Sequence, residues 1–276
     1  VLGDSGGHAR PWIEPGKSTE IRLSVGTYET GFGMQIWKNY EDGMRIFLRD
    51  PFGGAEIELV PVRGTDRIRV GETELLIYYG EPSPFDAAQE SYIEFVPERT
   101  YVESGFWTFR FLGTGDEETA ADLWLPSAAA VGRDTEFLES SPDTTLTIPS
   151  TAFRPVTVGA YDSGTGIYAP FSGRGDTRVY RAQKPDLAAP GVGIMAPDRN
   201  GGYSPVTGTS FAAPLVTGAA ALLMEWGIVR ENDPYLYGEK VKAYLRKGAR
   251  RLPSELAYPN PRLGYGALCV ADSLPK

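Results

Sequence analysis

The chain has 276 residues, of which 41% are hydrophobic and 23% charged, a composition that excludes disorder, collagen and coiled coil as descriptions of the whole. Its 36 Asp and Glu outnumber 27 Lys and Arg and give a net charge of −9, so we expect no nucleic acid and no anionic membrane as a partner. One cysteine, Cys269, excludes an internal disulfide framework, and one histidine, His8, restricts the acid–base chemistry available at neutral pH.

The amino terminus has neither an initiator methionine nor a signal peptide. Val1 and Leu2 lead directly into a glycine-rich segment without a basic stretch or a long apolar run. We therefore expect a processed, nicked or trimmed chain. The longest apolar segment, Phe211–Met224, is too short to cross a bilayer, so we expect no membrane span and interpret this segment as a buried helix.

Residues 13–149 are dominated by apolar side chains that alternate with polar ones and are interrupted about every ten residues by Gly, Pro or Asp. The pattern predicts about eight or nine short strands, the number expected for an antiparallel sandwich or jelly roll. We interpret Trp37, Trp107 and Trp124 as core residues, because they lie within this alternation. The alternating positions include Ile21, Leu23, Val25, Met34, Ile36, Ile57, Leu59, Ile68, Val70, Leu75, Ile77, Tyr79, Ile93, Phe95, Phe109, Phe111, Leu123 and Leu125.

After residue 150 the pattern changes from strands to a mixture of strand and helix. Pro155–Ala160 predicts a short apolar strand that ends in small residues. Phe211–Trp226 is apolar on every side, which is typical of the central buried helix of an α/β layer structure. Gly238–Gly248 predicts an amphipathic helix that ends at a glycine. Its inward-facing side chains are expected to be Val241, Tyr244 and Leu245.

The segment Gly208–Pro214 carries the strongest chemical signal. A serine in the first turn of a helix, such as Ser210, lies where unpaired backbone N–H groups and the positive end of the helix dipole converge, which suits stabilisation of an oxyanion. Gly208 allows a tight turn and close approach of a substrate. The alternative is that Thr209 or Ser210 is only a helix cap.

The same segment, Gly-Thr-Ser-Phe-Ala-Ala-Pro, resembles the nucleophile motif of subtilisin-like serine proteases. Three further segments resemble that family in the same order: Pro155–Ala160, Phe171–Gly175 and Lys184–Gly191. The resemblance implies an α/β fold, in which residues 150–276 form the C-terminal part of a subtilisin-like parallel-sheet domain. It also implies Ser210 as the nucleophile that attacks a peptide or protein substrate.

Residues 1–9 resemble the family's oxyanion-hole segment, with Asp4 at the position of its asparagine. The resemblance implies that Asp4 is a catalytic position. The substrate-binding residues it implies are Gly3, Ser5, Gly6, Gly208 and Thr209. In the family the catalytic Asp and His precede this segment, so His8 is not the base. We expect His8 to be a structural or rim residue, and the chain to be inactive without an N-terminal fragment that carries the missing Asp and His.

The order of these segments predicts three parts: an oxyanion segment at 1–12, an inserted all-β jelly-roll domain at 13–149, and the catalytic part at 150–276. Such an insertion resembles the clostridial Csp germination proteases, which implies limited proteolysis of a spore cortex-lytic enzyme and an extracytoplasmic or spore-associated location. Two alternatives are a noncatalytic pseudoprotease that binds a partner or germination signal, and a carbohydrate-binding role for the β domain.

No cofactor is expected to be required, and no metal site is predicted among the site residues. A calcium ion at the acidic segment Asp116–Glu118 is the alternative to a solvated loop. Cys269 lies beside Leu268 and Val270, so we interpret it as a small buried hydrophobic residue.

Overall fold

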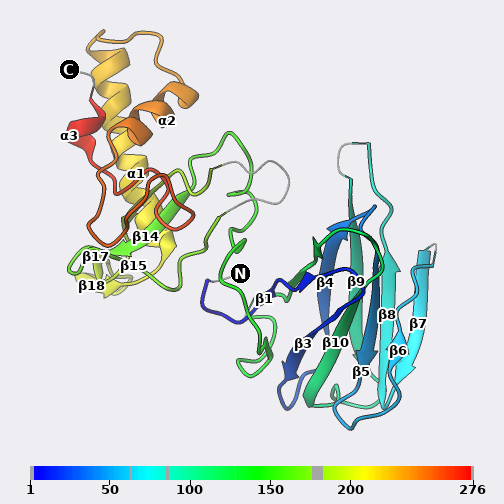
Figure 1. The fold of residues 1–276 in the computed structure, drawn as a ribbon. Coiled ribbons are helices and arrows are strands. Elements are labelled where there is room, and N and C mark those ends of the chain that lie inside the picture. Colours follow the sequence, from blue (N-terminus) through cyan, green and yellow to red (C-terminus); the bar gives the residue numbers. More distant parts are fainter. Residues whose placement is uncertain (1–2, 63, 85–86, 128, 176–182, 275–276) are drawn as a thin grey trace. The chain divides into compact units, whose positions relative to one another are not determined.

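The structure, a computed structural model, describes residues 3–62, 64–84, 87–127, 129–175 and 183–274 (Figure 1). The chain divides into two compact units. Unit 1 comprises Ser5–Pro142, and unit 2 comprises, of the described residues, 3–4 and 143–274. Unit 1 is built from strands, whereas unit 2 combines short strands with helices.

Unit 1 contains two antiparallel sheets. The six-stranded sheet has the order β1 (His8–Ala9), β12 (Asp122–Trp124), β4 (Phe32–Asn39), β9 (Ala88–Pro97), β8 (Thr73–Tyr79), β7 (Gly64–Val70). The five-stranded sheet has the order β13 (Glu136–Phe137), β3 (Ser18–Val25), β10 (Gly105–Gly113), β5 (Met44–Arg49), β6 (Ile57–Glu58). A separate pair joins β2 (Trp12–Ile13) to β11 (Thr119–Ala120).

The alternation in the sequence explains how these sheets bury one face each. In β3 every second residue from Ile21 is buried, and in β10 the buried Trp107 and Phe109 lie opposite Leu23 and Ile21. Side chains from both sheets form one hydrophobic cluster. The predicted strands are confirmed, but β5 was missed because Phe47, which points outward, interrupts the alternation of Met44, Ile46 and Leu48.

The three tryptophans of the alternating segments differ in burial. Trp107 is fully buried, as predicted. The prediction was wrong for Trp37 and Trp124, which are half-buried because they occupy the outward-facing phase of β4 and β12. Trp124 stacks on the His8 ring with centroids 5.0 Å apart.

Unit 2 is organised around the strand β14 (Val158–Asp162). It pairs in parallel with β16 (Leu187–Pro190) and antiparallel with β15 (Ile167–Tyr168), and a separate hairpin joins β17 (Ile194–Pro197) to β18 (Tyr203–Val206). The helices are α1 (Thr209–Met224), the π-helical extension η1 (Glu225–Val229), α2 (Gly238–Lys247) and α3 (Val270–Ser273). β14 begins later than the predicted strand because Pro155 has no N–H for a ladder, and the residues around it bond to side chains instead.

Helix α1 differs from the prediction of burial on every side. Only one stripe is buried, at Ala212, Val216, Ala219 and Leu223, whereas Leu222 is 53% exposed. The buried stripe packs with side chains of β14 and β16 in one cluster. No described residue covers the opposite face, although its side chains are apolar.

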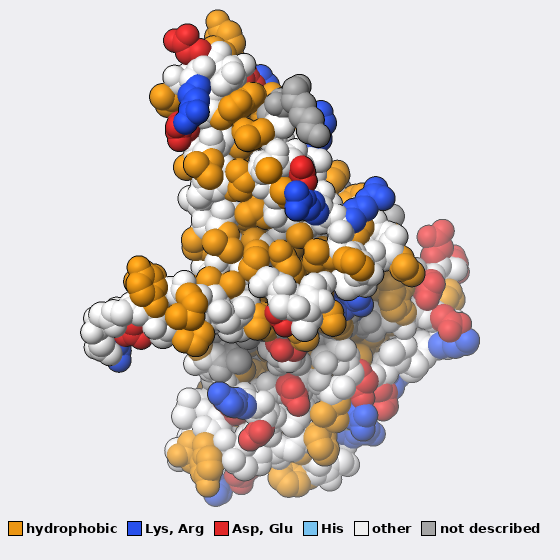
Figure 2. Space-filling view, turned by 90° about the vertical axis from the view of Figure 1, so that its left-hand side faces the viewer, with side chains coloured by type: hydrophobic (Ala, Val, Ile, Leu, Met, Phe, Trp, Pro, Cys, Tyr) orange, Lys and Arg blue, Asp and Glu red, His pale blue; other side chains and the backbone are white. Residues whose placement is uncertain are grey.

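The helix with its extension is also longer than the segment used to predict that no membrane span exists. That prediction considered Phe211–Met224 alone, which η1 extends. The combined segment Thr209–Val229 has a mean hydropathy of 1.5 and is long and apolar enough to cross a membrane. Figure 2 shows hydrophobic side chains gathered in a band over the helical part of unit 2.

Two smaller predictions can also be compared with unit 2. Helix α2 is confirmed: Val241 and Leu245 are buried, Tyr244 packs partly buried against the same cluster, and Gly248 caps the end. Cys269 is half-buried rather than buried, because it lies at the start of the short surface helix α3.

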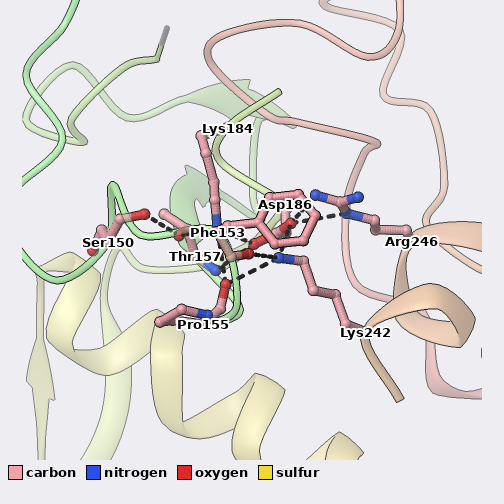
Figure 3. A network of polar contacts seen from close by, with 8 residues as sticks. All are labelled: Ser150, Phe153, Pro155, Thr157, Lys184, Asp186, Lys242 and Arg246. Atoms are coloured by element: carbon pink, nitrogen blue, oxygen red, sulfur yellow. Dashed lines mark hydrogen bonds and ion pairs between the residues drawn. The ribbon is translucent and has the colours of Figure 1, made fainter. Parts of the chain in front are cut away.

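A buried network of ion pairs and hydrogen bonds links the strands of unit 2 to α2 (Figure 3). The Asp186 carboxylate, which is 0% exposed, accepts hydrogen bonds from the Thr157 N–H (2.6 Å), Lys184 Nζ (2.9 Å) and Arg246 Nε (2.8 Å). Lys242 Nζ lies 3.2 Å away, and burial lowers the pKa of its ammonium group. The network therefore joins the chain before β14 to β16 and to α2.

Candidate active site

Ser210 lies in the first turn of α1 and is exposed. The cap position is Gly208, whose φ of 151° favours glycine, and no side chain caps the helix. The alternative that Thr209 or Ser210 serves as the cap is therefore wrong. The first turn carries no acidic side chain, so its free N–H groups and the positive end of the dipole remain available to an anion.

The start of α1 is fixed against the central strands through two glycines. The Gly208 N–H donates to the Gly191 carbonyl at 2.8 Å, directly after β16. A Cβ at Gly191 would lie 2.7 Å from the Cβ of Ala160 in β14, closer than packed carbon atoms approach. Only glycine at 191 allows this turn to lie against β14, so the backbone beneath Ser210 is positioned by the sheet.

Gly3 is also connected to β14, through Phe171 and Ser172. Its N–H donates to the Phe171 carbonyl at 3.2 Å, and a Cβ at Gly3 would lie 2.4 Å from the Ser172 carbonyl oxygen. The buried Ser172 in turn accepts a hydrogen bond at Oγ from the Ala160 N–H at 3.0 Å. Gly208 is thus connected to Ala160 through Gly191, and Gly3 is connected to Ala160 through Ser172. Ala160 therefore links the two segments of the predicted site.

The predicted site residues are divided between the two units. Unit 2 contains Gly3, Asp4, Gly208, Thr209 and Ser210, and Asp4 is exposed. The remaining two belong to unit 1, so the chain passes from one unit to the other directly after Asp4.

Ser5 and Gly6 form hydrogen bonds with other residues of unit 1. The Ser5 hydroxyl lies 3.4 Å from the Gly7 N–H, and the Gly6 carbonyl accepts from the Phe137 N–H at 2.8 Å. Gly6 has a φ of 64°, which favours glycine. Gly6 thus connects the end of the predicted oxyanion segment to strand β13.

His8 is a buried structural residue, not a rim residue. Its exposed fraction is 1%, with Nε2 2.9 Å from Asp122 Oδ1 and Nδ1 3.1 Å from the Ser141 carbonyl oxygen. Both ring nitrogens are occupied within unit 1, so the ring has no position free to accept a proton from a serine. The sequence did not reveal Asp122 as its partner, because 114 residues separate them.

The side chains described in the structure contain no group of three or more His, Cys, Asp or Glu that could hold a metal ion. The described side chains without such a group include those of Asp116–Glu118, the alternative calcium site of the sequence analysis.

An exposed serine at the N-terminus of a helix, backed by a parallel strand pair, points to the class of α/β serine hydrolases. The model of the subtilase family of peptidases matches residues 120–266. The structure of the Clostridium perfringens CspB protease is similar with a TM-score of 0.90 and 36% identity, covering 99% of this chain and 56% of that one. The chain therefore belongs to the subtilase family.

Two curated relatives come from Bacillus subtilis. Serine protease AprX is 33% identical over 158 residues, covering 49% of this chain and 33% of AprX. Minor extracellular protease Vpr is 31% identical over 114 residues, covering 38% of this chain and 13% of Vpr. This chain thus spans about half of the related CspB structure and a third or less of these two relatives.

Proposed function

We propose that the chain supplies the nucleophile half of a subtilisin-like serine endopeptidase that cleaves protein or peptide substrates. The observation that carries the proposal is the exposed, uncapped position of Ser210 at the N-terminus of α1, within the family motif. The Ser210 oxygen forms a bond to the scissile carbonyl carbon, and its proton passes to a base and then to the departing amine. The scissile C–N bond breaks as the amine leaves, and water then hydrolyses the acyl-enzyme ester and restores the Ser210 hydroxyl.

The base in this proposal comes from outside the chain. The sequence holds one histidine, and His8 is buried with both nitrogens engaged. A serine without a base is a weak nucleophile, so the chain alone is inactive. Activity requires the portion of a subtilase domain that carries the catalytic Asp and His, either in the same polypeptide or bound after a nick.

Labelling with a fluorophosphonate tests the role of Ser210. When the chain is combined with the segment that carries Asp and His, we expect covalent labelling at Ser210, which Ser210→Ala abolishes. Ser254→Ala, at a surface serine of the same unit, is the control and should label like the unaltered protein. Peptide mapping by mass spectrometry locates the label. Labelling that persists in Ser210→Ala, or turnover by the chain alone, would contradict the proposal.

Asp4 stands where the family places an amide donor, and a carboxylate there repels the developing oxyanion. Losing one such donor in a subtilisin costs about a hundredfold to a thousandfold in rate. We therefore expect Asp4→Asn in the complete enzyme to raise kcat by about a hundredfold with little change in KM, measured with a peptide substrate at neutral pH. An unchanged kcat would show that residue 4 does not contact the oxyanion.

A second candidate is a noncatalytic pseudoprotease that binds a partner or a germination signal. Asp4 at the position of the amide donor favours it. The complete protein would then resist labelling at Ser210 while remaining folded.

We further propose that unit 1 is a jelly-roll insertion and that the complete protein acts outside the cytoplasm, in association with spores, by activating a cortex-lytic enzyme. Similarity to the CspB structure supports this proposal, because the match covers 99% of this chain, and similarity to the minor extracellular protease Vpr supports an extracellular location. Digestion of a purified cortex-lytic proenzyme, compared between the complete protein and Ser210→Ala, tests the substrate.

A further inference from the structure

The position of Gly3 is set by one turn of unit 2. The Gly3 N–H donates to the Phe171 carbonyl at 3.2 Å. A Cβ at Gly3 would lie 2.8 Å from the Pro170 carbonyl oxygen and 2.4 Å from the Ser172 carbonyl oxygen, closer than packed atoms approach. Three successive carbonyl groups thus lie against Gly3. Because consecutive Cα atoms are about 3.8 Å apart, the turn also determines where Asp4 begins.

The turn is bonded to strand β14 at both of its ends. The Ala160 N–H donates to Ser172 Oγ at 3.0 Å, and the Ala160 carbonyl accepts from the Ala169 N–H at 3.1 Å. Within the turn, the Ser172 N–H donates to the Ala169 carbonyl at 2.9 Å. None of these bonds uses the Ser172 carbonyl, the group that lies against Gly3, so this carbonyl needs another donor.

The Tyr168 hydroxyl supplies that donor. It donates to the Ser172 carbonyl oxygen, the same oxygen against which Gly3 lies. Tyr168 is 7% exposed and Ser172 is 0% exposed, and no other described residue donates to this carbonyl. A buried acceptor without a donor is costly, so a carbonyl that loses the hydroxyl must move or admit water. Tyr168 therefore controls the position of this carbonyl.

Two arginines orient the Tyr168 side chain. Arg174 Nε donates to the hydroxyl oxygen at 3.3 Å, which leaves the hydroxyl proton for the Ser172 carbonyl. The guanidinium groups of Arg174 and Arg262 lie 5.0 and 6.0 Å from the ring centroid, within the range of a cation–π contact. Burial raises the pKa of the Tyr168 hydroxyl above its ordinary value, so the group remains a donor at neutral pH.

We infer that Tyr168 is a positioning residue for the oxyanion segment: its hydroxyl fixes the Ser172 carbonyl, and this carbonyl fixes Gly3 and hence the side chain of residue 4. The inference rests on the proposed function, in which residue 4 faces the developing oxyanion. In this role Tyr168 acts through Gly3 and touches no reacting atom. A misplacement of about 1 Å at a catalytic group can cost about a hundredfold in rate, so such a fixed turn affects catalysis.

A purely structural role for Tyr168 is the alternative. Its ring packs with Ala188 and Leu263 in a small cluster. Tyr168→Phe keeps this ring and removes only the hydroxyl. Tyr258 offers a matched control, because it packs against the same cluster and its hydroxyl donates to the Leu252 carbonyl, not to the turn that holds Gly3.

Hydrogen exchange tests the position of Gly3 without reference to activity. In the complete protein, Tyr168→Phe should raise the exchange rate of the Gly3 amide at least tenfold, because its acceptor Phe171 lies in the released turn. Tyr258→Phe should leave this rate unchanged. Arg174→Met, which removes the N–H groups that orient the hydroxyl, is a second variant and should change the rate in the same direction. Circular dichroism verifies the folding of each variant.

Steady-state kinetics test whether the hydroxyl acts through residue 4. In an Asp4→Asn background, adding Tyr168→Phe should lower kcat about tenfold with little change in KM, because a positioned amide donor is displaced. With Asp4 itself the loss should be smaller, since a carboxylate donates no hydrogen bond whose position could be lost. A structural role would lower kcat by the same factor in both backgrounds, because a loss of folded protein does not depend on residue 4.

Three results would overturn the inference: equal Gly3 exchange in Tyr168→Phe and the unaltered protein, the same changes in Tyr258→Phe, or an equal loss of kcat in both backgrounds. A complete protein that neither turns over a peptide nor labels at Ser210 would reject the proposed catalytic function. Faster Gly3 exchange in Tyr168→Phe would even then retain the fixing of Gly3 by Tyr168. The two claims can therefore fail separately.

Discussion

Asp186→Asn is expected to lower the free energy of unfolding of unit 2 by about 3–5 kcal/mol, the cost of removing one partner from a buried ion network. Asp186 is 0% exposed and its carboxylate faces three cations: Lys184, Lys242 and Arg246. The amide keeps the shape of the side chain but removes the negative charge. Lys184, which is 1% exposed, then remains buried without a counter-ion.

The measurement is urea unfolding followed by peptide-resolved hydrogen exchange, which distinguishes unit 2 from unit 1. Peptides from β16 and α2 should lose protection, while those from β3 and β10 should not. Glu225→Gln, which removes an exposed ion pair with Arg230 in the same unit, is the control and should cost less than about 1 kcal/mol. A loss below that value for Asp186→Asn would show that the network contributes nothing beyond a surface pair.

His8→Phe is expected to destabilise unit 1 by about 3 kcal/mol, the cost of removing a hydrogen-bond partner from a buried carboxylate. The phenyl ring preserves the stack on Trp124 but lacks both ring nitrogens. The Asp122 carboxylate, 2% exposed, then retains Arg10 at 3.6 Å but loses its 2.9 Å bond. The Ser141 carbonyl also loses its 3.1 Å contact with the His8 side chain.

A double-mutant cycle identifies the cause of that loss. Asp122→Asn removes the charge that His8→Phe leaves behind, so the double variant should be more stable than the sum of the two single losses predicts. Arg67→Gln, at the exposed pair with Glu74, is the control. Thermal unfolding followed by tryptophan fluorescence and by hydrogen exchange of β12 measures each variant. Strict additivity would mean that His8 contributes through packing, not through its bonds to Asp122.

Local pattern accounts for much of the fold. Alternation places the strands of unit 1, because every second residue of a strand faces the core. It fails at β5, where the outward Phe47 is as apolar as its buried neighbours. The amphipathic pattern of α2 is confirmed for the same physical reason, while Lys242, buried within it, was not foreseen because its partner Asp186 lies on another element.

The motif around Ser210 was sufficient to place this residue in the first turn of a helix. Which faces of that helix are buried was determined only by the tertiary structure. Hydropathy alone made α1 a helix covered on all sides, since composition records how apolar a segment is and not which neighbours are present.

Residue types and their order along the chain were enough to indicate the subtilase family, the candidate nucleophile and the absence of a second histidine, because these depend on short contiguous motifs. The partnership of His8 with Asp122, the charge network of Asp186 and the open face of α1 required the folded chain. Each depends on contacts between residues distant in sequence, and local pattern carries no information about which distant groups meet.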